Sequence, residues 1–590
     1  MRRSLGEEGS LAGLASRALG WSFASNAAAR FGVLPIGIVL ARILGPHAFG
    51  TYAVALVALM AVLSFNDLDV GLAIVRWEGE PTQIAPTVAT LSLLSSLLTY
   101  AGCYLGAPAF ASAMGAPAAT GVIRVLALNV IVDGITTSPA AFMERYFCQE
   151  RKMIADQVNC WLGAAVSIGL ALGGYGAMSL AIGRMVGAFA SAVLFLVLSP
   201  KPVRFGFDPA KARALCRFGL PLAAASIVVF AVTNVDQVVV GHMLGTTALG
   251  YYALALNLAG WPVTMFSLPV RNVAPAVFSR LQQDRPAMRA GFLSVAGLLG
   301  SVALPVCLVM GGAAVPLLGF VYGAAWVPAA RALVWLAVLG ALRILYELVY
   351  DFFVVLARAR VVFTVQIAWL GALVPALVAG AWADGISGAG IAEVAVAGCV
   401  VLPWYLYELS RVGIRRRSLA ARLWLPLVAA AGAGAAAAVA ARVIRVDLEA
   451  ISVSSGFGLC AIGLLGYWMW PSLAALRADL GQRPAVELSG AAAATGRSAA
   501  GRAAVAGLSP GPRVPRQESE LSLPWDALIS LPTFHDFTGP LPVYWDTVAW
   551  MSWDPAFEPR GRHAMGGPPY REERRARQLQ RIRPTEGSQP

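Results

Sequence analysis

Residues 44–56 read Leu44-Gly45-Pro46-His47-Ala48-Phe49-Gly50-Thr51-Tyr52-Ala53-Val54-Ala55-Leu56, and residues 244–256 read Leu244-Gly245-Thr246-Thr247-Ala248-Leu249-Gly250-Tyr251-Tyr252-Ala253-Leu254-Ala255-Leu256. The two stretches are identical at eight of thirteen positions without a gap, and each is a Gly-containing turn between long apolar runs. A second segment is also repeated: Trp161-Leu162-Gly163-Ala164 occurs again, 208 residues later, as Trp369-Leu370-Gly371-Ala372. Because two separate places share nearly the same spacing, the chain contains a duplicated unit.

The composition is that of a chain embedded in a membrane. Hydrophobic residues make up 58% of it and charged residues 13%, whereas about 25% of a soluble domain is charged. Apolar runs of about 20 residues cross a bilayer core, and lipid forces them to be helical. We therefore expect an all-α polytopic membrane protein. The net charge of +13 does not indicate a nucleic-acid partner, because the bases lie in short loops beside the apolar runs.

Neither the cysteines nor the histidines indicate a bound metal. The seven cysteines are scattered without a CxxC spacing, and the four histidines have no ligand-like spacing. We therefore expect no disulfide framework, metal or cofactor. The first apolar run continues to about residue 43, beyond the length of a signal-peptide core, so we expect no cleavage there.

The apolar runs predict fourteen transmembrane helices, at residues 17–43, 49–73, 84–106, 119–142, 153–173, 177–198, 218–243, 249–270, 291–311, 329–354, 361–381, 388–409, 421–441 and 452–470. They divide the chain into an N-terminal six-helix lobe (1–200), a C-terminal six-helix lobe (211–410) and two additional helices (419–470). Because six is even, both repeats face the same way and are related by an axis along the membrane normal, with the substrate between them.

Lysine and arginine residues are concentrated in alternate loops. If the N-terminus is in the cytoplasm, the inner loops hold twenty of these bases. The outer loops then hold only Arg442 and Arg445, with Arg42 at the rim of a turn. Cytoplasmic loops carry such an excess, so both termini are expected in the cytoplasm.

Residues 471–590 form a tail of different composition. Its first part, 471–520, lacks the apolar residues of a core, so the tail is expected to be mostly disordered. An aromatic-rich segment at 521–557 and a basic end follow. The tail is either a dispensable extension or a docking segment for a partner or for anionic lipid.

Charged residues within the spans are candidate functional residues, because a charge at the bilayer centre costs about 2.5 kcal/mol or more. Asn26 and Arg30 lie on one face of the first span, and Asp236 lies in the equivalent seventh span. The other candidates are Arg124 and Asp133 on span 4, Arg184 on span 6, Arg343 and Glu347 on span 10, and Glu393 on span 12. The alternative for Arg30 and Asp236 is a structural ion pair. Arg343 and Glu347, four residues apart, can neutralise each other.

Two further acids, Asp67 and Asp69, lie toward the inner end of span 2. They are candidates for an inner gate with Arg76, or they are simply solvated. No nucleophile–base motif, phosphate loop or metal-ligand cluster occurs. The outer loops, including 107–118 and 311–328, are short and almost without charge, which favours transport over catalysis.

Three segments carry a family resemblance. They are Leu40-Ala41-Arg42-Ile43-Leu44-Gly45-Pro46 with Phe49-Gly50-Thr51-Tyr52, then Phe65-Asn66-Asp67-Leu68, and Tyr322-Gly323-Ala324-Ala325-Trp326. Over roughly residues 10–470 the chain resembles the polysaccharide transporter family, the flippases for lipid-linked oligosaccharides within the multidrug/oligosaccharidyl-lipid/polysaccharide exporter superfamily.

The resemblance implies two six-helix lobes in a V, alternating access, and a polyprenyl-pyrophosphate-linked oligosaccharide as substrate. This substrate would pass from the cytoplasmic to the outer leaflet of the bacterial inner membrane during lipopolysaccharide or exopolysaccharide assembly, with its lipid tail among membrane lipids. Arg30, Arg124 and Arg184, with Asn26, are the candidate ligands of the pyrophosphate. The candidates for ion coupling or gating are Asp67, Asp133 and Asp236. Other polysaccharide-assembly proteins are the candidate partners of the tail.

Four alternatives remain open. A multidrug/cation antiporter of the same superfamily would have acids rather than Arg30 at the centre of its cavity. A major-facilitator transporter would have a Gly/Asp/Arg-rich loop after span 2. A membrane polymerase or ligase would need polar outer loops. A scaffold that acts through its tail would tolerate the loss of Arg30 but not of 521–557.

Overall fold

Every regular element in the described residues is a helix, as membrane-embedded apolar runs require. The computed structural model describes the chain outside residues 1–10, 67–69, 78, 268–284, 357 and 483–590; some further side chains, 11–34 and 469–482 among them, are not described. The first group of helices comprises α1 (Leu11–Asn66), α2 (Val70–Arg76), η1 (Pro81–Gln83), α3 (Ala85–Ala113), α4 (Ala119–Arg145), α5 (Gln149–Leu172) and α6 (Ala177–Leu198). The second comprises α7 (Pro209–Pro262), η2 (Val263–Ser267), α9 (Arg285–Gly312), α10 (Ala314–Tyr322), η3 (Ala324–Ala329), α11 (Ala330–Val355), α12 (Ala359–Val396), η4 (Ala397–Val401), α13 (Leu402–Val412), α14 (Arg416–Val443) and α15 (Asp447–Gln482).

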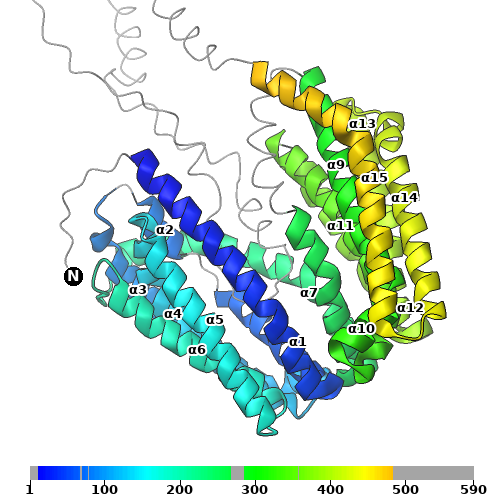
Figure 1. Ribbon diagram of the computed structural model, residues 1–590. Helices are drawn as coiled ribbons and strands as arrows, with labels where there is room; N and C mark the ends of the chain where they lie inside the picture. Colours follow the sequence, from blue (N-terminus) through cyan, green and yellow to red (C-terminus); the bar gives the residue numbers. More distant parts are fainter. Residues whose placement is uncertain (1–10, 67–69, 78, 268–284, 357, 483–590) are drawn as a thin grey trace, which may run out of the picture.

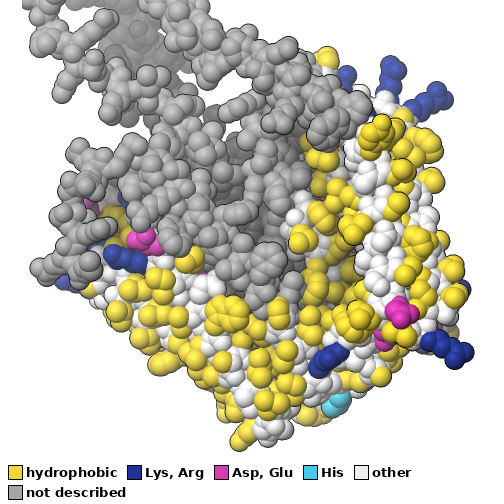
Figure 2. Space-filling model, viewed as in Figure 1, with side chains coloured by type: hydrophobic (Ala, Val, Ile, Leu, Met, Phe, Trp, Pro, Cys, Tyr) yellow, Lys and Arg dark blue, Asp and Glu magenta, His cyan; other side chains and the backbone are white. Residues whose placement is uncertain are grey.

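The two groups are arranged as the arms of a V (Figure 1). They meet at the end where α10 lies and diverge toward the opposite end. On the face seen in Figure 2, charged side chains gather near the ends of the helices, and the surface between them is largely apolar. This distribution is the one expected of helices whose middle portions face lipid.

Both copies of the repeated turn have the same backbone conformation. Helix α1 bends at Gly45 (φ 72°, ψ 173°) and helix α7 bends at Gly245 (φ 80°, ψ −179°). A residue with a Cβ is strained in this region of φ and ψ, by about 1–3 kcal/mol. The backbone conformation of the bend therefore explains why glycine occurs at these two positions.

The number of candidate spans differs from the fourteen expected. Eleven helices in the described part of the chain are long and apolar enough to cross a membrane. The whole difference arises because three of these helices each cover two expected spans and contain a sharp bend between them: at Gly45 in α1, at Gly245 in α7 and at Asp384–Gly385 in α12. The backbone leaves the helical conformation at each bend, so each of these three elements consists of two helical segments joined at a kink.

Two other expectations need correction. The outer segment 311–328, expected to be a loop, folds into α10 and most of η3. Helix α15 continues through Pro471 to Gln482, so the part of the tail expected to be disordered begins later than residue 471. Residues 483–590, including the aromatic segment 521–557, lie outside the described residues.

The connection between the groups is fixed to the first group. The Thr90 hydroxyl donates to the Gly206 carbonyl (2.9 Å), and Leu215 of α7 is buried in a cluster with Ile74 and Phe142. Asp208 caps α7, and its hydrogen bond from Lys211 lowers the pKa of this carboxyl group below its ordinary value. Contacts with the first group therefore continue past residue 211, where the sequence places the start of the second lobe.

Replacing Gly45 by alanine is expected to destabilise the protein by about 1–3 kcal/mol, because the new Cβ would be held in the strained conformation of the bend. Gly245→Ala should behave in the same way. Gly37→Ala is the matched control, because Gly37 lies on the same helix with no heavy atom within 4 Å of an added Cβ. Thermal unfolding of the detergent-solubilised protein measures the difference. Equal melting temperatures for Gly45→Ala and Gly37→Ala would contradict the explanation.

Candidate functional site

The structure describes the side chains of only four of the seven candidate site residues. Asn26 and Arg30 belong to helix α1, but their side chains lie outside the described residues, as does the whole of Asp67. Arg124, Asp133, Arg184 and Asp236 are described. These four lie on α4, α6 and α7, and their surroundings differ.

Arg124 is held by an aromatic neighbour. Its guanidinium lies over the ring of Tyr104, 4.1 Å from the centroid, and its Nε donates to the Tyr104 carbonyl oxygen (3.3 Å). Such a cation–π contact contributes about 0.5–2 kcal/mol. In this arrangement an incoming phosphate would have to compete with Tyr104 for the guanidinium.

Arg184 is half-buried, two turns into α6. Its side chain forms no hydrogen bond or ion pair with the described residues. Leu180, one turn earlier on α6, packs in a cluster with Leu40, Ile36 and Tyr52 of α1. The helical face that carries Arg184 is therefore near the face of α6 that contacts α1, the helix that also carries Asn26 and Arg30.

The acids differ in burial. The side chain of Asp133 is exposed, and its backbone carbonyl accepts hydrogen bonds from the hydroxyls of Thr136 (3.1 Å) and Thr137 (2.9 Å). Asp236 is buried, with 5% of its surface exposed. The structure does not place these two acids in a single cluster: Asp133 belongs to the first group of helices and Asp236 to the second.

Asp236 belongs to a buried charged cluster in the second group. The Tyr252 hydroxyl donates to Asp236 Oδ2 (3.3 Å), and the Gln237 backbone N–H donates to Oδ1 (2.8 Å). Glu393 of α12, also buried, interacts electrostatically with Asp236, and Arg343 of α11 interacts with both acids. We call Asp236, Tyr252, Arg343 and Glu393 the C-lobe charge cluster. When all three charged groups are ionised, the two acids and one base have a net negative charge. A buried site of this kind favours the binding of a proton or a cation.

The first repeat has no acid at the positions that match Asp236 and Glu393. The 200-residue spacing matches Asp236 and Tyr252 with Ile36 and Tyr52, which pack in the same apolar cluster. Gly176 (φ 54°, ψ −134°) and Gly385 (φ 56°, ψ −134°) have the same backbone conformation. Counting onward from these two glycines matches Arg184 with Glu393. Of the two buried acids in the second repeat, Glu393 therefore corresponds to a base in the first repeat, and Asp236 corresponds to an apolar residue.

Sequence reasoning missed the partners of these charges. Tyr252 was visible only as part of the repeat, and its hydrogen bond to Asp236 forms across the bend at Gly245. Arg331 and Asp384 form an exposed ion pair (2.8 Å) between α11 and α12. Glu408 lies between Arg358 (4.0 Å) and Arg411 (3.4 Å). The spacing of Glu408 and Arg411 on one helix was the only sequence signal for that group.

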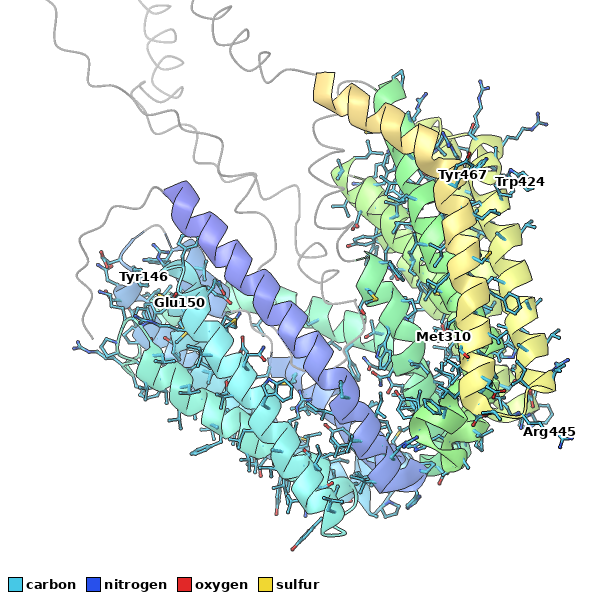
Figure 3. All side chains as sticks on the ribbon, in the orientation of Figure 1. Tyr146, Glu150, Met310, Trp424, Arg445 and Tyr467 are labelled. Atoms are coloured by element: carbon cyan, nitrogen blue, oxygen red, sulfur yellow. The ribbon has the colours of Figure 1, made fainter. Side chains whose placement is uncertain are left out.

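Aromatic and charged residues mark the two ends of the helices in Figure 3. Tyr146 and Glu150 in the first group, and Trp424 and Tyr467 in the second, lie toward the diverging end of the V. Arg445 lies at the opposite end of the α14–α15 pair. The segments expected to face the cytoplasm thus lie toward one end in both groups.

The sequence is similar to a protein family and to individual proteins of polysaccharide biosynthesis. A family described as "Polysaccharide biosynthesis protein" matches residues 39–331. The lipopolysaccharide biosynthesis protein WzxC of Escherichia coli (strain K12) is 25% identical over 394 residues, covering 66% of this chain and 80% of that protein. The succinoglycan biosynthesis transport protein ExoT of Rhizobium meliloti (strain 1021) is 24% identical, and the match covers 53% of this chain and 63% of ExoT. The matched region thus spans less than two thirds of ExoT.

Solved structures resemble this fold at low sequence identity. The lipid II flippase MurJ, in an inward closed conformation, has a TM-score of 0.64 at 12% identity, covering 77% of this chain and all of that chain. An inward-facing multidrug resistance transporter of the MATE family has a TM-score of 0.50 at 17% identity, covering 65% of this chain and 95% of that chain. The fold is therefore that of a MurJ- and MATE-like multi-pass membrane protein.

Proposed function

We propose that this chain, which belongs to the polysaccharide biosynthesis flippase family of the multidrug/oligosaccharidyl-lipid/polysaccharide exporter superfamily, moves a polyprenyl-pyrophosphate-linked oligosaccharide across the bacterial inner membrane. The family is one of transporters rather than enzymes. The observation that carries the proposal is the pair of helix groups joined at one end and divergent at the other (Figure 1). Two such groups can expose a central path to each side of the membrane in turn.

The proposed topology contains fourteen crossings. Helices α1, α7 and α12 would each cross the membrane twice, with their bends at the outer surface. This gives six crossings in each repeat and two more in α14 and α15. Both termini would then be cytoplasmic, in agreement with the excess of bases in the loops expected to be inside. The V would open toward the cytoplasm.

The first lobe would hold the pyrophosphate. Two phosphate groups in a membrane need cationic partners, and guanidinium groups bind phosphate with two parallel hydrogen bonds. Arg184 is the preferred candidate, because its side chain has no hydrogen bond or ion pair with the described residues. Arg30 and Asn26 are proposed to bind the pyrophosphate with it. Arg124 would take part only after leaving the ring of Tyr104.

The second lobe would couple transport to an ion gradient through Asp236. The first repeat has Ile36 in the corresponding place, so the fold of a lobe does not require an acid there. A buried acid that the architecture does not need is better explained by an exchanged proton or cation. Asp67 and Asp133 remain proposed as gating or coupling residues. Membrane lipid would surround the polyprenyl chain, and the tail would contact other assembly proteins.

Deletion of the gene tests the function. Lipid-linked oligosaccharide should accumulate on the inner leaflet while surface polysaccharide disappears, and the full chain should restore both. Arg30→Ala and Arg184→Ala should each lower restoration at least tenfold. Arg331→Ala, which removes an arginine from an exposed ion pair, is the matched control and should restore fully. Intact surface polysaccharide in the deletion strain, with altered drug sensitivity, would favour the antiporter.

Truncation after Gln482 tests the tail separately. This variant keeps all of α15, and it is expected to restore surface polysaccharide to within about twofold of the full chain, because the lobes contain all the proposed ligands. The amount of surface polysaccharide, normalised to the protein in the membrane, measures this. Failure of the truncated chain at normal protein levels, together with full restoration by Arg30→Ala, would assign the function to the tail.

A further inference from the structure

We propose that the two copies of the repeated turn form the external gate of this transporter, with Trp326 as its latch. The inference rests on the proposed function and assigns a role to the two motifs that the flippase assignment leaves unexplained, the repeated Gly-containing turn and the Tyr322–Trp326 segment. Both motifs meet at the joined end of the V.

The two turns cross at glycine residues. A Cβ added to Gly50 would lie 1.8 Å from the Thr246 carbonyl oxygen, and one added to Gly250 would lie 2.2 Å from the Pro46 carbonyl oxygen. The contact is reciprocal: each glycine meets the residue that directly follows the bend glycine of the other turn, as in an interface with twofold symmetry. Only hydrogen atoms on the two Cα atoms permit this approach. The duplicated glycines are thus explained by contact between the repeats as well as by the bends.

We call the contact between residues 44–50 and 244–250 the seam. Trp326, from the second lobe, packs against this seam. Its side chain is 1% exposed, and its indole N–H donates to the Ala41 carbonyl oxygen of α1 (3.0 Å). Its ring meets Phe49 of the first lobe (5.4 Å between centroids) and Tyr251 of the second (6.1 Å) edge-on. One side chain therefore makes contacts with both lobes, and the bond to Ala41 exists only while the lobes are together.

The rim of the seam is polar. His47 Nδ1 lies 3.2 Å from the Thr246 hydroxyl and 3.3 Å from the Thr247 hydroxyl, and Arg42 donates to the Phe320 carbonyl oxygen. These exposed groups can exchange their partners for water when the lobes separate. The seam thus combines a close contact at two glycines, one buried tryptophan and exposed polar contacts at its edge. Such a contact can be tight when closed and can still separate, as a gate requires.

Reversible cross-linking tests the gate. The seven native cysteines would be replaced, and a His47→Cys/Thr247→Cys pair would be cross-linked in intact cells with a short reagent that bridges thiols. The expected result is a cross-link that lowers restoration of surface polysaccharide at least tenfold and is reversed by reducing agent. The matched control is Arg331→Cys/Asp384→Cys, a pair at an ion pair within the second lobe, whose cross-link should leave restoration unchanged.

A second measurement does not depend on the substrate. Gly50→Val should keep the seam open, and a cysteine at Phe49, half-buried in the closed seam, should then react at least fivefold faster with a membrane-impermeant maleimide added outside. Trp326→Phe, which keeps a ring but loses the bond to Ala41, should produce a smaller increase. Gly102→Val, at an exposed α3 position with no atom near an added Cβ, should produce none.

The outcomes separate the gate from the proposed function. A cross-linked seam with undiminished restoration, or no cross-link at the seam when the control pair is cross-linked, would overturn the gate and leave the flippase assignment in place. Unchanged labelling of the Phe49 cysteine in Gly50→Val would also overturn it. If the deletion strain has normal surface polysaccharide, the proposed function fails, while faster labelling in Gly50→Val would still support a gate at this seam.

Discussion

Replacing Arg343 by methionine is expected to destabilise the second lobe by about 3 kcal/mol and to abolish transport. Arg343 is the base that interacts with both Asp236 and Glu393. Removing one partner from a buried charged group leaves the remaining charge uncompensated, which costs about 3–5 kcal/mol, and Arg343 is only half-buried. The amount of protein in the membrane and its melting temperature in detergent measure the first effect. Restoration of surface polysaccharide measures the second.

A double variant separates stability from coupling. Adding Asp236→Asn to Arg343→Met removes one of the two acids, so most of the lost stability should return. Transport should remain absent if Asp236 exchanges a proton or cation. Arg331→Met, in an exposed pair with Asp384, is the control and should change stability by about 1 kcal/mol or less. Normal stability of Arg343→Met, or transport by the double variant, would contradict the role given to the C-lobe charge cluster.

Gly183→Leu is expected to prevent α5 and α6 from packing together. A Cβ at Gly183 would lie 2.0 Å from the Ser167 hydroxyl oxygen and 2.6 Å from the Gly163 carbonyl oxygen. Small residues let membrane helices approach this closely, and inserting a large side chain into a packed interface costs about 1–3 kcal/mol or more. Because backbone atoms are among those in the way, the cost should be at the upper end of that range. The amount of folded protein in the membrane should fall several-fold.

The control for this packing lies on the facing helix. Gly169 of α5 is exposed and has no heavy atom within 4 Å of an added Cβ, so Gly169→Leu should accumulate normally. Size-exclusion chromatography of both variants in detergent distinguishes a folded monomer from aggregate. Equal recovery of the two variants would contradict the close packing of α5 against α6.

Single residues show where prediction from the sequence succeeded. Gly45 and Gly245 were recognised because a turn between two apolar runs is a local feature, and the structure has a bend at both. The break between the two spans at Asp384–Gly385 is local in the same way, because the backbone leaves the helical conformation there. The charged cluster was predicted only in part. Asp236, Arg343 and Glu393 were recognised separately as charges within spans, and nothing in their spacing indicated that they meet.

The sequence by itself determined that the chain is helical, lies in a membrane and is duplicated. These properties follow from composition, run length and self-similarity, which neighbouring residues fix through backbone hydrogen bonding and the hydrophobic effect. Only the tertiary structure decided which helical faces meet. It joined Trp326 to Ala41 and left Arg124 on Tyr104, because these contacts depend on how each helix is rotated and packed. Helical spacing sets the face on which a side chain lies, but only packing between helices sets what that face contacts.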